Sequence, residues 1–370
     1  MKIYYFIFIG IILFFFIFVS CIRDKSVDVP NGDNPPIKNN LMIVYPNSGN
    51  KITLVDYNTL EIVKQIIVEI PDSLQIQRMC LSTNHDYFIF SASDGKPFFR
   101  NYFISYNIAQ DSVENIIATD LDSIGAPRIT AAGLPAQPGL FYLYTHNVGL
   151  YSIDFITKKI ITISPECGMP NYFYSSPNQE WIVLNKYFTG NENDYTELRF
   201  YKTINGLAQP DFILNMNDQD SVDVVDLVFS PDNTQIYISY LLSKRRAVYE
   251  KAFFGSYNLV TKQLHSSYVA LPWSANPYQI AYSEKRREVY MAGEYAELVI
   301  IDTSTPIYSI KTAIGLPGKK PGPSEILITP NENVAFVSCA DSDFIVAIDL
   351  DKRQVIKQIN IHNSYLMMLL

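Results

Sequence analysis

Polar and charged residues recur four positions before a short turn motif along much of the chain. Each turn begins at a Ser or Thr and resembles the SPDN sequence of residues 230–233. The residues at this position, including two assigned from less regular segments, are Arg78, Arg128, Tyr172, Asp226, Gln279, Glu325 and Tyr365. If the fold brings them together, they form a candidate binding site for a small polar ligand. The alternative is that they only satisfy one another as salt bridges.

Catalysis at such a site would use carboxylates such as Asp226 and Glu325. An acid–base mechanism needs a carboxyl pKa that is shifted by burial or by a close partner. The sequence contains no G-x-S-x-G, H-E-x-x-H, Walker or dinucleotide-binding glycine motif. It has 4 His and 4 Cys, which leaves little material for a zinc or thiol site. Whether the chain is an enzyme therefore stays open, and the motifs favour a binding protein.

One acidic segment is a weak candidate for Ca²⁺, and no other cofactor is predicted. Asp218, Asp220 and Asp223 place three carboxylates close together, and oxygen ligands suit Ca²⁺. The central Gly and the late Glu of an EF-hand loop are absent, so a solvated loop is the alternative. Cys80, Cys167 and Cys339 follow Cys21, and we expect them to be buried free thiols.

Aromatic and arginine residues gather in the longer connecting segments, at 91–101, 185–195, 241–254 and 272–277. These residue types are enriched at recognition surfaces for proteins and sugars. Packing within the fold is the alternative for each of them. The candidates for ligand recognition are Phe98, Phe99, Tyr187, Arg245, Arg246 and Trp273.

The N-terminus has the pattern of an export signal. Lys2 precedes an uncharged, largely apolar run of 17 residues (3–19), which is followed by Ser20 and Cys21. The end of this segment resembles the lipobox of bacterial lipoproteins, which implies that Cys21 carries a lipid. We therefore expect a signal peptide at 1–20 and a lipidated Cys with a flexible tether at 21–40. An uncleaved membrane anchor is the alternative, since 17 residues span about 26 Å as a helix.

A second marker shows that the rest of the chain is a repeat. An apolar strand followed by a turn recurs with its aligned residue at Asp56, Ser105, Asp154, Tyr201, Ser256, Asp302 and Asp349. The spacings are 49, 49, 47, 55, 46 and 47 residues. Each unit contains four short runs rich in Val, Ile, Tyr and Phe, with turn residues between them. Units of this length and composition predict an all-β, seven-bladed β-propeller of four-stranded blades at 41–370.

Some repeats resemble a known family. Residues 324–361 look like the YVTN-type repeats of seven-bladed propellers, a superfamily that includes lactonase-like proteins. The resemblance implies that the seven polar residues form a ring at the mouth of a central channel. It also suggests a hydrolase with its site at that mouth as an alternative function.

The two ends of the repeat region complement each other. Residues 41–68 begin with the second strand of a unit. Residues 364–370 have the pattern of the first strand of a unit whose other three strands do not follow. A blade shared between the termini leaves no open edge. We therefore predict that the C-terminal strand pairs with the N-terminal blade.

Composition limits the function. The 370 residues are 48% apolar and carry a formal net charge of −8, so the chain is globular and has no cationic face for nucleic acid. We expect an exported lipoprotein of the bacterial outer membrane or cell envelope, periplasmic or surface-exposed. Its propeller would be a monomeric, non-catalytic binding or scaffold module for a protein, peptide or glycan.

Overall fold

The computed structural model describes most of residues 40–370. The ranges are 40–46, 50–82, 85–94, 101–118, 128–131, 140–145, 149–155, 157–164, 169–188, 195–204, 207–216, 221–243, 249–265, 269–270, 277–293, 296–318, 323–362 and 364–370. The predicted signal peptide, Cys21 and all of the tether except Asn40 lie outside these ranges. Within them, no helix has the length and apolar character needed to cross a membrane.

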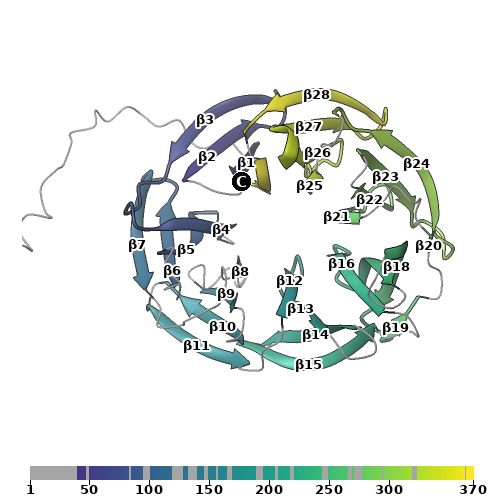
Figure 1. Cartoon of the computed structure of the whole chain (residues 1–370), viewed down its shortest axis with the longest axis horizontal. Coiled ribbons are helices and arrows are strands. Elements are labelled where there is room, and N and C mark those ends of the chain that lie inside the picture. The colour runs from purple at the N-terminus through teal and green to yellow at the C-terminus, as the bar shows by residue number, and fades with distance from the viewer. Residues whose placement is uncertain are drawn as a thin grey trace, which may run out of the picture. The chain divides into compact units, whose positions relative to one another are not determined.

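Seven antiparallel sheets are arranged in a ring, as Figure 1 shows. The prediction of an all-β, seven-bladed propeller is confirmed. Blade 1 consists of β29 (Ser364–Leu369), β1 (Leu41–Pro46), β2 (Lys51–Asp56) and β3 (Glu61–Ile67). Blade 2 consists of β4 (Gln75–Leu81), β5 (Tyr87–Ser93), β6 (Asn101–Asn107) and β7 (Ser112–Ala118).

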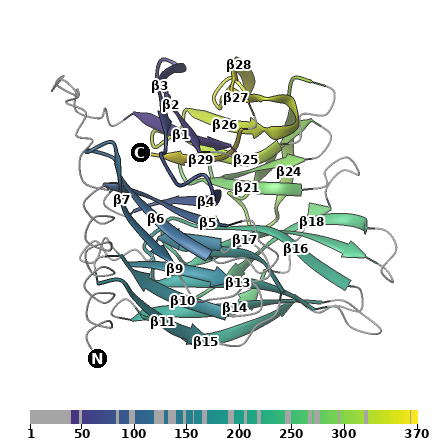
Figure 2. The same cartoon turned by 60° about the vertical axis from the view of Figure 1, so that its left-hand side comes forward.

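The next two blades follow the same order from the inside outward. Blade 3 consists of β8 (Arg128–Ala131), β9 (Leu140–Thr145), β10 (Gly149–Asp154) and β11 (Lys159–Ser164). Blade 4 consists of β12 (Met169–Ser175), β13 (Trp181–Phe188), β14 (Tyr195–Ile204) and β15 (Leu207–Met216). Figure 2 shows these two blades from a second direction.

The last three blades complete the ring. Blade 5 consists of β16 (Ser221–Phe229), β17 (Gln235–Ser243) and β18 (Tyr249–Asn258), with β19 (Gln263–Leu264) and β20 (Val269–Ala270) sharing the outer position. Blade 6 consists of β21 (Pro277–Ser283), β22 (Glu288–Gly293), β23 (Glu297–Asp302) and β24 (Ser309–Gly315). Blade 7 consists of β25 (Pro323–Ile328), β26 (Val334–Cys339), the 3₁₀ turn η1 (Ala340–Ser342), β27 (Phe344–Asp349) and β28 (Gln354–Asn360).

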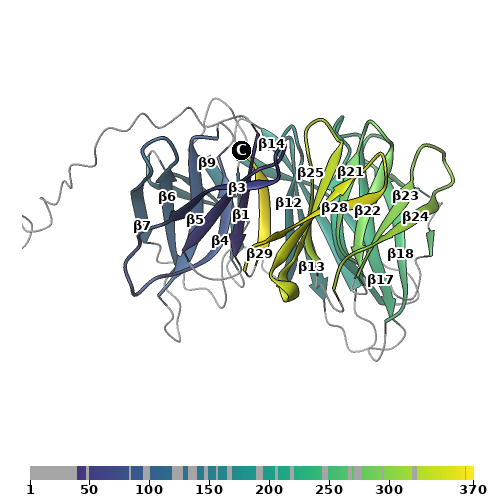
Figure 3. The same cartoon turned by 90° about the horizontal axis from the view of Figure 1, so that it is seen from above.

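Blade 1 takes its inner strand from the far end of the chain. β29 pairs antiparallel with β1, with Leu369 opposite Met42 and Met367 opposite Val44. The two strands lie side by side in Figure 3. The amide of Leu370 donates a further hydrogen bond of 2.9 Å to the carbonyl oxygen of Leu41.

The core is divided into seven apolar clusters, each lying between two neighbouring blades. Strand β1 shows how one sequence serves two of them. Its odd-numbered residues Leu41, Ile43 and Tyr45 pack against blade 2, whereas Met42 and Val44 pack against blade 7. Successive side chains of a strand point to opposite faces, so a strand buried on both faces is apolar throughout.

The turns of the SPDN type are fixed by their first residue. In blade 5 the Ser230 hydroxyl accepts the amide of Gln235 at 3.0 Å, and Asn233 adopts a left-handed φ of 56°. A single residue can hold this conformation where the surrounding bonds fix it. Equivalent amide-to-hydroxyl bonds form at Ser82, Ser176 and Thr329.

Candidate functional site

The predicted ring residues lie on the inner strands of the blades. Six of them pair with the fifth residue of the second strand of their blade, which shows that their positions are equivalent. These six are Arg78, Arg128, Tyr172, Asp226, Gln279 and Glu325. For Arg78, Arg128 and Tyr172 the structure describes the backbone alone.

A β-bulge precedes the ring position in most blades. The register shifts by one residue, which leaves Gln77, Asn171, Val225, Tyr278 and Ser324 without a partner opposite. A bulge bends a strand and redirects the side chain that follows it. The repeat therefore specifies both the polar residue and the bend that orients it.

The same register corrects the ring position in blade 1. Tyr365 occupies the bulge, and Leu366 pairs with Tyr45, the fifth residue of β1. The half-buried Leu366 is thus the equivalent of Asp226, and Tyr365 is not. The sequence alignment is off by one here because no SPDN-type turn follows the strand to fix the count.

Asp226 joins the inner strands of neighbouring blades. Its side chain is 5% exposed, and its Oδ2 accepts a hydrogen bond of 2.8 Å from the amide of Ile280, on β21 of blade 6. The Ser239 hydroxyl donates to its backbone carbonyl at 3.3 Å. Within the described residues, the sheets of blades 5 and 6 are not joined by backbone hydrogen bonds. The Asp226 carboxylate therefore supplies an acceptor for a backbone amide that would otherwise lack one.

The environment of Asp226 raises the pKa of its carboxyl group. Burial raises the pKa of this carboxyl from 3.8 to about 7. Hydrogen bonding with the Ile280 amide, the Tyr174 side chain and the Leu227 amide favours the charged form and only partly offsets the burial. A buried carboxyl with no cationic partner among the described residues is expected to behave in this way.

Glu325 makes the same kind of connection two junctions further on, between blades 7 and 1. Its Oε2 accepts a hydrogen bond from the amide of Met367, on β29 of blade 1. Met367 directly follows the ring residue Leu366, just as Ile280 directly follows Gln279. Both ring carboxylates therefore bind the amide that follows the ring position of the next blade.

This geometry changes the interpretation of the ring. Asp226 and Glu325 lie on β16 and β25, and β21 lies between these strands in Figure 1. Each carboxylate is bonded to a different neighbour and not to the other. Gln279, half-buried on β21, occupies the ring position between them. In the described part of the ring, the polar side chains mainly hold blades together.

A recess of about 270 Å³ opens beside Asp226, between the inner strands of blades 4 and 5. Its volume is below the range of about 300–1,000 Å³ that is usual for ligand pockets. The residues that line it are Tyr174, Ser175, Pro177, Leu227, Val228 and Phe229. They belong to the ends of β12 and β16 nearest the SPDN-type turns, and Pro177 lies in the turn that follows β12.

The remaining predicted residues fall mostly outside the described parts of the chain. This holds for Phe98, Phe99, Arg245, Arg246, Trp273, Asp218, Asp220 and Cys167, and for Tyr187 the structure describes the backbone alone. Asp223 is half-buried on β16. The described residues contain no group of three His, Cys, Asp or Glu side chains placed to hold a metal ion. Cys80 and Cys339 are buried free thiols.

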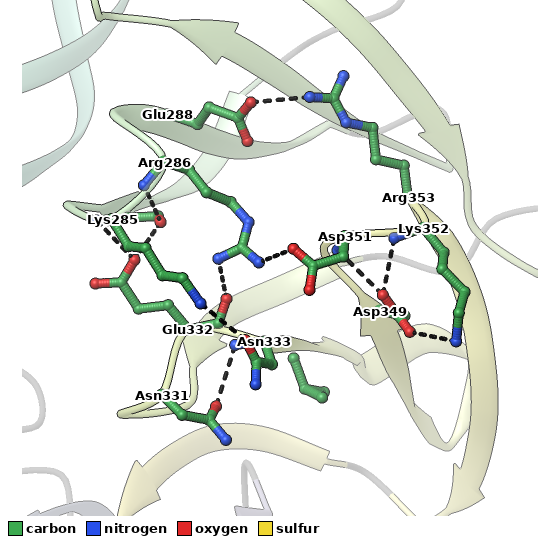
Figure 4. Close-up of polar contacts among 12 residues, drawn as sticks. Lys285, Arg286, Glu288, Asn331, Glu332, Asn333, Asp349, Asp351, Lys352 and Arg353 are labelled. Carbon is green, nitrogen blue, oxygen red and sulfur yellow. Dashed lines mark hydrogen bonds and ion pairs between the residues drawn. The ribbon is translucent and has the colours of Figure 1, made fainter.

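A polar network between blades 6 and 7 was not anticipated from the sequence (Figure 4). Glu288, 2% exposed at the start of β22, accepts hydrogen bonds from Lys311 at 2.7 Å, Arg353 at 2.9 Å and the Tyr290 hydroxyl at 2.6 Å. Arg353 comes from blade 7 and Lys311 from blade 6. One buried anion thus binds two cations and links the blades.

The two SPDN-type turns at this junction are also bonded to each other. The Glu332 carboxylate accepts hydrogen bonds from the Ser283 hydroxyl and, at 3.0 Å, from the Lys285 amide. Arg286 donates to the Glu332 carbonyl and forms an ion pair with Asp351. The run of three cations at 285–287 was the available signal, but the partners of Lys285 and Arg286 are 46 to 65 residues away in the sequence.

Comparison with known proteins supports the fold but does not identify a function. Neither a protein-family model nor a curated protein matches the sequence. Hydrazine synthase of Kuenenia stuttgartiensis has a TM-score of 0.63 at 14% identity, covering 84% of this chain and 92% of that chain. Dihydro-heme d1 dehydrogenase NirN gives 0.58 at 10% identity, covering 94% and 79%. AztD from Citrobacter koseri gives 0.56 at 10% identity, covering 88% and 96%.

Proposed function

We propose that the chain is an envelope-anchored lipoprotein whose propeller is a non-catalytic binding or scaffold module for a protein, peptide or glycan. The apolar N-terminal segment that ends in Cys21 supports the anchor. The YVTN-type character of residues 324–361 supports a place among exported repeat propellers. The residues that we assign to the ligand are the ring residues Arg78 and Arg128 and the aromatic and arginine residues of the connecting loops.

The observation that carries this proposal is how the ring carboxylates are used. Asp226 and Glu325 each accept a backbone amide from the next blade. An acid–base pair would need carboxyl groups that reach a shared substrate, with one held as acid and the other as base. Carboxylates that are committed to separate junctions support a rigid frame around a binding surface.

A thermal-shift screen of the detergent-solubilised full chain tests the binding proposal. The panel contains glycans, peptides, lactones and Ca²⁺. A ligand at 100 times its Kd stabilises the folded state by about 2.7 kcal/mol and raises the Tm. We expect a glycan or peptide to give this shift and R78A/R128A to lose it, while K352A, at an exposed turn, keeps it. No shift with any member of the panel would contradict the proposal.

The anchor is tested separately by fractionation. We expect Cys21→Ser to move the protein out of the membrane fraction and to abolish its labelling by a fatty-acid analogue. Retention of both in the variant would contradict the lipid anchor and favour an uncleaved membrane segment.

A hydrolase remains the second candidate because of one specific observation. The pKa of Asp226, about 7, lies where a general acid or base works best at neutral pH. Turnover of a lactone by the wild type that Asp226→Asn abolishes, without a loss of folding, would establish this alternative. The binding proposal predicts no turnover above the rate in buffer.

A further inference from the structure

The outer strands differ between blades at one equivalent position. In five blades the register shifts where the outer strand pairs with the third strand, and one exposed residue is left without a partner opposite. These residues are Val63, Glu114, Asp211, Lys311 and Ile356. Charges at the edge of a sheet protect it from unwanted contacts, and blades 2, 4 and 6 follow this rule. Blades 1 and 7 carry Val and Ile instead.

Blades 7 and 1 are neighbours, and each carries exposed apolar residues on its outer strand. Val63 is 58% exposed and Ile356 is 41% exposed, and β3 adds Ile62 at 42% and Ile67 at 64%. The ion pair between Lys357 and Glu61 ties β28 to β3. We call Ile62, Val63, Ile67 and Ile356 the rim strip. Exposed apolar residues that cluster in this way mark a contact surface.

The described part of the chain begins at one end of this strip. Asn40 is held by Tyr57, whose amide donates to the Asn40 carbonyl at 3.0 Å and whose hydroxyl donates to Asn40 Oδ1 at 3.2 Å. Leu41, Asp56 and Glu61 stand side by side on β1, β2 and β3. Two strand spacings place this point about 10 Å from the start of β3.

The length of the segment before Asn40 limits how far the strip can lie from a lipid anchor at Cys21. The 18 residues from 22 to 39 connect the strip to the lipid that we propose on Cys21. A flexible chain of that length has an end-to-end distance of about 23 Å. A tether this short holds the domain at an effective concentration in the millimolar range, so a weak apolar contact becomes favourable.

We propose that the rim strip lies against the lipid bilayer, with Ile62, Val63 and Ile356 inserted at the headgroup–acyl boundary. Burial of apolar side chains at this boundary supplies the attraction. Because the strip is on the outer rim, the propeller stands edge-on, and both ends of its channel open to the aqueous side. The inference rests on the lipid anchor proposed above, and it adds an orientation in which the ring and the loops stay accessible to a ligand.

Photocrosslinking to lipid tests the orientation. The lipidated full chain is reconstituted in vesicles of phosphatidylethanolamine and phosphatidylglycerol that contain a diazirine-bearing lipid, and the crosslinked peptides are mapped by mass spectrometry. The strip variant is I62S/V63S/I356S. The control variant replaces outer-strand isoleucines of similar exposure on other blades, I116S/I213S/I310S. Matching Tm values of the two variants and the wild type establish that both are folded.

We expect wild-type crosslinks to concentrate on residues 61–67 and 354–360. In the strip variant they fall at least about fivefold, because interfacial binding scales with the apolar area that is buried. In the control variant they stay at the wild-type level. Anchored protein with crosslinks spread over other blades would overturn the orientation and leave the anchor intact. Protein that is absent from the membrane fraction would overturn the anchor itself. Crosslinks from β3 to an envelope protein in whole cells would identify the strip as a protein-docking edge and also overturn the proposal.

Discussion

Replacing Asp226 by Asn is expected to stabilise the protein at alkaline pH and to change little at acidic pH. In the unfolded chain the carboxyl has a pKa of 3.8, and in the folded protein burial raises the pKa to about 7. The folded state therefore binds the proton more tightly. Between these two pKa values the free energy of unfolding falls by about 1.36 kcal/mol for each pH unit, because only the unfolded state has released its proton.

The size of the change in stability follows from the pH range between the unfolded and folded pKa values of Asp226. From pH 5 to pH 8 the wild type loses about 2.7 kcal/mol of stability through Asp226, and the loss levels off above the folded-state pKa. Asn cannot ionise, and its side-chain oxygen can still accept the Ile280 amide. For about 330 residues the unfolding entropy is about 0.7 kcal/mol per kelvin, so the loss corresponds to about 4 °C in Tm.

The assay is calorimetry of the wild type and D226N at pH 5 and pH 8. The expected result is that the Tm difference, variant minus wild type, is about 4 °C larger at pH 8 than at pH 5. The control is Asp72→Asn, which removes the carboxyl of an exposed turn residue in the same way. If D226N shows the same difference at both, or is less stable at pH 8, Asp226 is ionised throughout and its hydrogen-bond donors outweigh burial.

Three further changes test the junctions and the core. Deleting 364–370 removes the inner strand of blade 1 and should lower the Tm of the whole domain, and an unchanged Tm would show that β1 needs no inner neighbour. Glu288→Gln should lower the free energy of unfolding, measured with denaturant, by about 2–3 kcal/mol. This is at the low end for a buried ion pair because Lys311 and Arg353 are 38% and 32% exposed. No loss would show that solvent replaces the pair. Burial raises the pKa of the Cys80 thiol, so iodoacetamide at pH 8 should modify it only after unfolding, and rapid labelling of the folded protein would contradict that burial.

The number of blades could be predicted from the sequence because the evidence for it is local. Each SPDN-type turn is closed by bonds within five residues, as at Ser230 and Gln235. Strands buried on both faces, such as β1, are apolar throughout. Such features depend on neighbours along the chain, and repetition makes them visible above chance.

The exact alignment of equivalent residues between repeats was harder to predict from the sequence. The aligned residues Ser105 and Ser256 differ by two from the structural equivalents of Asp56, which are Asn107 and Asn258. Those Asn side chains accept turn amides, as the Asp56 carboxylate does. Asn and Asp are interchangeable in this role. A pattern that requires Asp or Ser therefore selects a neighbouring residue.

The sequence by itself determined the turns, the alternation of the strands and the polar character of the ring position, because each depends on residues close together in the chain. Only the tertiary structure decided what the polar groups do. Asp226 and its donor Ile280 are 54 residues apart, and Glu325 and Met367 are 42 apart. Glu288 and Arg353 are 65 apart. A carboxylate that faces a ligand and one that bonds the next blade have the same local sequence, and closure of the ring selects between them.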